Sequence, residues 1–151
     1  MFQWRASTSF ARLCVLLLVA MAVTTGHADT PLRVEQAWIR LLPGDLPLAG
    51  YFQLVNESGA PANLVSAESP GFGGIMLHRS IVVGGSSRME HVDSVQVPDG
   101  GSVRFEPGGY HLMLMKRQDA LRVGDHVPIT LRFADGRQLT AEFEVRAANA
   151  N

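Results

Sequence analysis

The stretch Val103–Met115, VRFEPGGYHLMLM, contains an alternating apolar and polar run, a Pro-Gly-Gly segment, and a second, largely apolar run. Alternation with a period of two is typical of a half-buried β-strand, because successive side chains point to opposite faces. Glycine adopts positive φ without steric cost, so the Pro-Gly-Gly segment favours a turn. The stretch therefore predicts two consecutive strands, at 103–106 and 110–115.

Similar runs recur over residues 33–146 and predict an all-β domain. Nine strands are expected, over Val34–Leu41, Gly50–Val55, Ala62–Ala67, Ile75–Val83, Met89–Val97, Val103–Glu106, Tyr110–Met115, Val127–Phe133 and Leu139–Val145. Gly-Gly pairs at 73–74, 84–85, 100–101 and 108–109 predict turns between strands. Gln118–Val123 is predicted to be a helical turn or a loop. This spacing of strands favours a single-domain sandwich or small barrel.

The first 28 residues have the pattern of a secretory signal peptide. Arg5 and Arg12 accompany the eleven-residue apolar run Leu13–Val23, and the small residues Gly26 and Ala28 precede a cleavage site. Eleven residues are too few for a membrane-spanning helix, which needs about 20. We expect cleavage before Asp29, a periplasmic location, no integral membrane segment, and a mature domain over residues 29–151.

Charge and cysteine content exclude several functions for the mature domain. Without residues 1–28 the chain has 11 basic and 14 acidic residues, a net charge of −3, so nucleic acid is not expected as a partner. The only cysteine, Cys14, lies at the start of the signal's apolar run, which argues against a lipid anchor. The mature domain then has no thiol for a disulfide, an iron–sulfur cluster or a cysteine-based zinc site.

The methionine and histidine residues of the mature domain gather within forty residues. All four Met and three of the four His occur in the groups Met76-x-His78, Met89-x-His91 and His111-x-Met113-x-Met115. Residues two apart share one face of a strand, so each strand can present its donors to one side. A core Met often only fills space, and a lone His such as His126 is commonly a surface residue. Neither role explains why Met and His occur two residues apart in three separate groups.

Thioether and imidazole without thiolate form a soft, neutral donor set. This set favours Cu(I) over Mg²⁺ or Ca²⁺, and a blue-copper centre would need a cysteine thiolate. We therefore expect copper that is carried rather than cycled between oxidation states. Two other hypotheses stay open: a zinc- or copper-dependent enzyme using His78, His91 and His111, and a metal-free interaction sandwich with a Met-rich contact patch. Thioethers would have no role in the enzyme.

The intervals between four of these donors resemble a family signature. His78, ten residues, Met89, twenty-one residues and His111-x-Met113 match the H-x10-M-x21-H-x-M pattern of periplasmic copper chaperones of the PCu(A)C type. Other segments are also similar to this family, and the resemblance covers 33–146. These segments are Ala37–Arg40, Ala49–Phe52 with Asn56, Pro107–Met113, and Leu121–Asp125 with Leu131-x-Phe133 after it.

The resemblance implies a cupredoxin-like Greek-key β-fold that binds one Cu(I) per chain through His78, Met89, His111 and Met113. It implies a metallochaperone, not an enzyme, that delivers copper to a Cys-rich acceptor during assembly of the cytochrome c oxidase copper centre. We expect the protein to be a monomer. A thiol copper chaperone is a second candidate partner, and copper storage or scavenging is the alternative function. Met76 and His91 are expected at the rim of the site. Met115 is expected in the core, and Trp38 is expected to have a packing role rather than to shield the metal.

Overall fold

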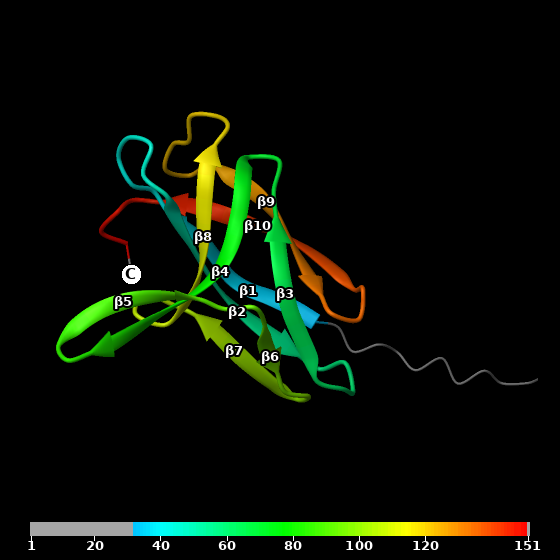
Figure 1. The fold of residues 1–151 in the computed structure, drawn as a ribbon. Coiled ribbons are helices and arrows are strands. Elements are labelled where there is room, and N and C mark those ends of the chain that lie inside the picture. Colours follow the sequence, from blue (N-terminus) through cyan, green and yellow to red (C-terminus); the bar gives the residue numbers. More distant parts are fainter. Residues whose placement is uncertain (1–31, 151) are drawn as a thin grey trace, which may run out of the picture.

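The computed structural model describes residues 32–150. The predicted signal peptide, with Cys14 and the cleavage before Asp29, lies outside the described residues. The described residues form ten β-strands and no helix, which confirms the all-β prediction (Figure 1). The strands are β1 (Leu32–Arg40), β2 (Leu48–Asn56), β3 (Ala62–Glu68), β4 (Phe72–Val83), β5 (Ser86–His91), β6 (Val95–Val97), β7 (Gly101–Phe105), β8 (Tyr110–Arg117), β9 (His126–Phe133) and β10 (Gln138–Arg146). Over residues 32–150, no helix long and apolar enough to cross a membrane was found.

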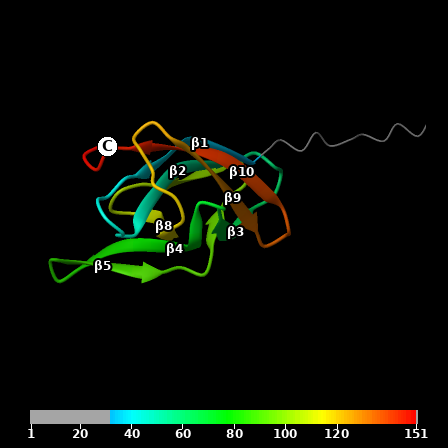
Figure 2. The ribbon, with the colours of Figure 1, turned by 90° about the horizontal axis from the view of Figure 1, so that it is seen from above.

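All ten strands join one hydrogen-bonded sheet in the order β5-β4-β8-β7-β2-β1-β10-β9-β3-β6. Several neighbours in this order are distant in sequence, because the chain crosses between the two halves of the sheet. Strand β4 pairs with β8 and β3 pairs with β9, both antiparallel, whereas β1 pairs with β10 in parallel. The sheet curls around a common interior, and Figure 2 shows β4 and β5 along one side of it.

The core lies inside the curled sheet and receives side chains from all ten strands except β5. Phe52 stacks on Phe105 with ring centroids 4.2 Å apart and meets the edge of Phe143 at 5.6 Å. The strands that carry the Met and His donors also contribute Leu77 from β4 and Leu112 from β8. Because neighbours along a strand point to opposite faces, burial of these leucines directs the adjacent donors away from the core.

The strand predicted over Met89–Val97 is wrong, because the structure divides it. Strand β5 ends at His91 and pairs with β4, whereas β6 begins at Val95 and pairs with β3 at the opposite edge of the sheet. The crossover contains Asp93 and Ser94, which interrupt the apolar pattern without a Gly or Pro. The Gln118–Val123 segment is a loop that ends in a turn.

The turn predicted at Gly73-Gly74 is also wrong, since both residues lie inside β4. A Cβ atom on Gly73 would lie 2.8 Å from the Cβ of Lys116 in β8, where φ is 53°. Gly73 therefore permits a close approach of two strands rather than a change of direction. In contrast, Gly84 and Gly85 have φ of 57° and 80° and form the predicted two-residue turn between β4 and β5.

Candidate metal centre

The strand register places the Met and His donors on one face of the β5-β4-β8 segment. His78 of β4 is directly opposite both His91 of β5 and His111 of β8, and Met76 is opposite Met113. Residues that face each other across strands share a face of the sheet, as do residues two apart on one strand. We refer to the seven residues as the donor cluster: Met76, His78, Met89, His91, His111, Met113 and Met115.

Three histidines form a row across these strands. The ring centroid of His78 lies 5.9 Å from that of His91 and 5.9 Å from that of His111, and both pairs meet edge to face. The solvent exposure of the three side chains rises along the row. His111 is only 5% exposed, His78 is partly buried, and the His91 side chain is 58% exposed. The row therefore leads from the protein interior to solvent.

His78 has an unsatisfied ring nitrogen at the centre of the row. Its Nδ1 atom is buried and has no hydrogen-bond partner. Burial lowers the pKa of His78, and the charges of His111 and His91 lower it further. An imidazole binds a metal only in its neutral form, which a lowered pKa favours. A buried, neutral nitrogen without a partner fits a role as a metal ligand.

A backbone carbonyl orients the ring of His111. The Nδ1–H group of this ring donates to the Gly109 carbonyl oxygen across 3.2 Å, which leaves the lone pair on Nε2. Gly109 belongs to the Pro107-Gly108-Gly109 turn immediately before β8, and Gly108 has φ of 83°. Sequence reasoning identified this turn but missed its contact with the histidine, although the turn lies only two residues away.

The methionines differ in exposure around the histidine row. Met89 is 66% exposed on β5, Met76 is exposed on β4, and Met113 is partly buried beside His111 on β8. Met115 was expected in the core, but it is partly buried on the donor face opposite Gly74. A Cβ on Gly74 would lie 3.5 Å from the Met115 methyl group, which is an ordinary van der Waals contact, so the thioether packs directly over this glycine.

The three histidines alone do not converge on a common point. His91 and His111 lie on opposite sides of His78, on the two strands that flank β4. Within residues 32–150, no group of three or more His, Cys, Asp or Glu side chains is arranged to hold a metal ion. This arrangement disfavours the three-histidine enzyme site. The thioether sulfurs of the donor cluster lie on the same face of the sheet as these histidines.

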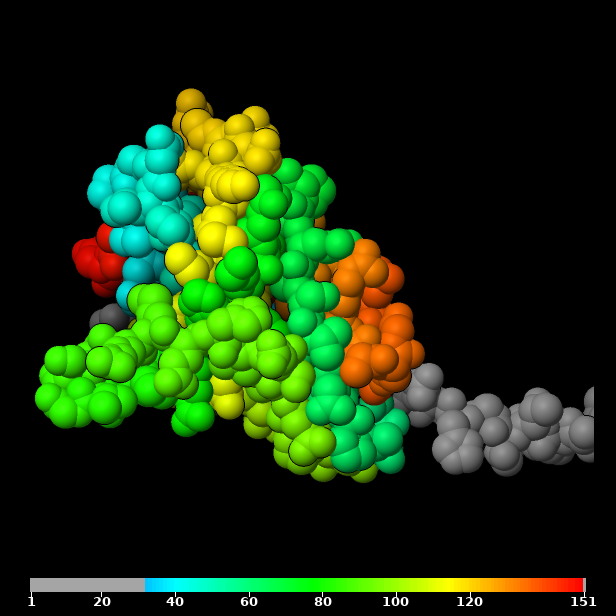
Figure 3. All heavy atoms as spheres, in the orientation of Figure 1, coloured from blue at the N-terminus to red at the C-terminus, as the bar shows by residue number. Residues whose placement is uncertain are grey.

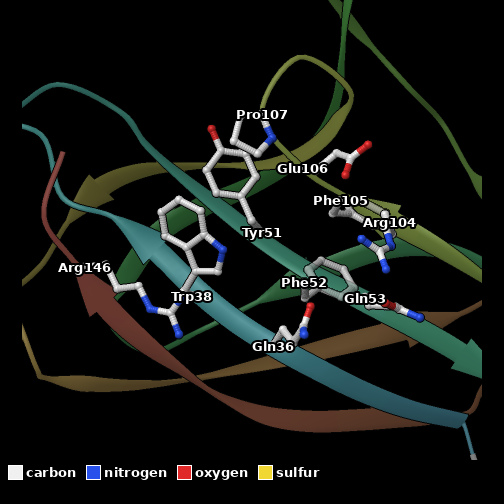
Figure 4. A pocket seen from close by; sticks show the side chains of 10 residues that line it. All are labelled: Gln36, Trp38, Tyr51, Phe52, Gln53, Arg104, Phe105, Glu106, Pro107 and Arg146. Atoms are coloured by element: carbon white, nitrogen blue, oxygen red, sulfur yellow. The ribbon is translucent and has the colours of Figure 1, made fainter. Parts of the chain in front are cut away.

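Aromatic rings continue the row beyond His111. The Tyr51 ring lies 6.5 Å from His111 and 4.7 Å from the ring of buried Trp38, over which the Arg146 guanidinium lies at 5.6 Å. Figure 4 shows these three side chains in a pocket of about 410 Å³ that also includes Gln36 and Arg104. None of the donor-cluster residues lines this pocket. The aromatic pair therefore separates it from the histidines.

The sequence matches a family profile and is similar to a known protein. The profile of the family described as "Putative lipoprotein LpqE-like" matches residues 32–145. The "Putative lipoprotein Lxx21020" of Leifsonia xyli subsp. xyli is 31% identical over 124 residues, which are 82% of this chain and 74% of that protein.

Two solved structures share the fold. The copper-bound PCuAC domain from PmoF2 is 25% identical with a TM-score of 0.64, over 77% of this chain and 92% of that domain. The solution structure of Cu(I)-DR1885 from Deinococcus radiodurans is 32% identical with a TM-score of 0.65, over 81% of this chain and 83% of that one. This chain therefore has the fold of the PCuAC domains, which confirms the cupredoxin-like fold class predicted from the sequence.

Proposed function

This chain belongs to the LpqE-like family, and on that premise we propose that it is a copper chaperone that binds one Cu(I) ion and passes it to a partner. The observation that carries the proposal is the donor cluster, in which thioethers and imidazoles from three adjacent strands share one face of the sheet. The copper-bound PmoF2 domain and Cu(I)-DR1885 have the same fold, which supports a copper-binding role.

We assign the Cu(I) ligands as His78, Met89, His111 and Met113. His78 contributes a buried nitrogen without a partner, and His111 has one nitrogen engaged by Gly109 and the other free. Met113 is two residues from His111 on β8, and Met89 extends from β5, diagonally across from His78. Two imidazoles and two thioethers are neutral and soft, which favours Cu(I) over harder cations.

We propose that the protein acts as a periplasmic monomer that delivers Cu(I) to a Cys-rich copper domain of a respiratory oxidase. The lipoprotein names of the matched family and relative support export. Thiolates attract Cu(I) by charge as well as by softness, whereas the proposed ligands are neutral. Transfer to a thiolate acceptor is therefore favourable, and a thiol copper chaperone is a second candidate partner.

Removal of His111 tests the proposal. Protein purified without an affinity tag should contain close to one copper per chain, and His111→Ala should weaken Cu(I) binding by more than the 10- to 100-fold typical of residues outside the coordination shell. Competition with a chromogenic Cu(I) chelator measures the affinity. His126→Ala is the matched control, because His126 is an exposed histidine on β9, outside the donor cluster. Equal affinity of His111→Ala and wild type would reject the site.

A further inference from the structure

The β4–β5 hairpin extends the donor cluster away from the body of the protein. Every residue of β5 is exposed, and the strand lies at the edge of the sheet, where β4 is its only neighbour among the strands of residues 32–150. Figures 1 and 3 show this hairpin projecting from the rest of the molecule. The four proposed ligands include only Met89 from β5, so His91 of the donor cluster has no role in the resting site.

His91 lies beside His78 on β5, on the side opposite His111. Its ring lies as far from His78 as the ring of His111 does, at 5.9 Å, but on the opposite and exposed side. The Nε2 atom of His91 is 3.4 Å from a carboxylate oxygen of the fully exposed Asp93. His78 therefore has an imidazole on its buried side and another on its solvent side.

The donor-bearing face of the hairpin has no charged side chain within β4 and β5. That face presents Ser80 and Val82 beside the Met and His residues, and Ser87 opposite Val82. The charged residues Arg79, Arg88 and Glu90 lie on the other face, and the Arg79 guanidinium is held 5.4 Å from the Tyr110 ring. A monovalent cation moving outward along the donor face thus meets no fixed positive charge.

We propose that His91 is a transfer ligand, which takes Cu(I) from the buried end of the site and presents it to the acceptor. The Cu–N bond to His91 forms as the bonds to His111 and Met113 break, so that His78, Met89 and His91 hold the ion at the exposed side. An acceptor thiol then loses its proton to solvent and its sulfur binds the ion as the remaining ligands leave. Copper stays Cu(I) throughout. This inference rests on the proposed function.

Transfer kinetics of His91→Ala test this role. Its equilibrium Cu(I) affinity should fall far less than that of His111→Ala, because the four resting ligands remain. Its rate of copper transfer to a reduced peptide with a CxxxC motif should fall at least tenfold. His91→Met should restore most of the rate, because a thioether is also a Cu(I) donor. The rate for His126→Ala should equal that of wild type.

Ag(I), a redox-inert ion with the same charge and ligand preference, gives a readout independent of transfer. In ¹⁵N spectra of the His111→Ala variant, Ag(I) should shift the ring nitrogens of His78 and His91 and leave those of His126 unchanged. Unaltered His91 signals, or an unaltered transfer rate in His91→Ala, would overturn the inference about His91 and leave the proposed copper-binding function in place. A loss of affinity in His91→Ala as large as in His111→Ala would also overturn it, since His91 would then be a resting ligand. Absence of Cu(I) binding by wild type would instead reject the proposed function itself.

Discussion

His78 is the residue at which the buried and exposed parts of the donor cluster meet. Its pKa is lowered first by burial and then by the charges of His111 and His91. We predict that its ring titrates below the ordinary histidine value of about 6.5, and that His91→Ala moves the titration back upward by removing one positive neighbour. NMR of the ring protons against pH measures both effects. An unchanged His78 titration in His91→Ala would contradict the predicted coupling.

The sign of the pH dependence follows from the lowered pKa. Between this pKa and about 6.5 the unfolded chain binds a proton at residue 78 that the folded chain does not bind. The free energy of unfolding should therefore fall as pH drops through that interval and become independent of His78 below it. Copper binding at His78 should persist to a lower pH than binding by a free imidazole, because proton competition begins later.

At the scale of elements, the β4–β5 turn positions half of the donor cluster. Gly84 and Gly85 both have positive φ, which costs an L-residue about 1–2 kcal/mol at each position. We predict that the double variant Gly84→Val, Gly85→Val loosens the hairpin and lowers Cu(I) affinity. Global stability should change little, because β5 contributes nothing to the core. Chelator competition and amide hydrogen exchange in β5 measure the two effects.

Gly136 provides the control for backbone strain. It has φ of 88° in the turn between β9 and β10, remote in the sheet order from the donor strands. Gly136→Val should lower the unfolding free energy of the body without altering Cu(I) affinity. If the two variants affected affinity equally, copper binding would depend on overall stability rather than on the geometry of the hairpin.

The strand patterns allowed much of this arrangement to be predicted, because i and i+2 donors on a strand must share a face. The alignment of His78 with His91 and His111 in one row depends on register, which is set by distant contacts such as that of Leu77 and Leu112 in the core. Gly73 illustrates the same limit. Its glycine is needed for the approach of Lys116, forty-three residues away, and a local pattern cannot distinguish that need from a turn.

Asn56 shows a related gap between a motif and its role. It is completely buried, and its side-chain amide donates to the carbonyl oxygens of Ala60 and Val97 at 2.8 and 3.0 Å. The asparagine thus connects the end of β2 with β6. Its presence in a family-like segment was visible in the sequence, whereas its partners became apparent only with the fold.

At the scale of the whole molecule, the core and the donor cluster occupy opposite faces of the same strands. The core packs through residues such as Leu77 and Leu112 and needs no metal ion to complete it. We predict that the copper-free protein keeps its far-UV circular dichroism spectrum. Bound Cu(I) should raise the unfolding free energy only by mass action, about 1.4 kcal/mol for each tenfold excess over Kd. Calorimetry at buffered Cu(I) concentrations measures the increment, and an unfolded copper-free chain would contradict the prediction.

The position of the cluster on a projecting hairpin also determines how copper can leave the molecule. A thiolate can enter the coordination shell only if the ion is within reach, and exposed Met89 and His91 provide that access.

Because a dithiolate holds Cu(I) more tightly than neutral thioether and imidazole ligands, we predict that copper passes from this protein to the acceptor and does not return. After mixing copper-loaded protein with an excess of a reduced acceptor carrying a CxxxC motif, most copper should be found on the acceptor after separation, and the reverse mixture should leave it there. Variants that lack the two acceptor cysteines should receive none. Copper that stayed on this protein at equilibrium would favour storage or scavenging, because the site would then bind Cu(I) more tightly than a dithiolate does.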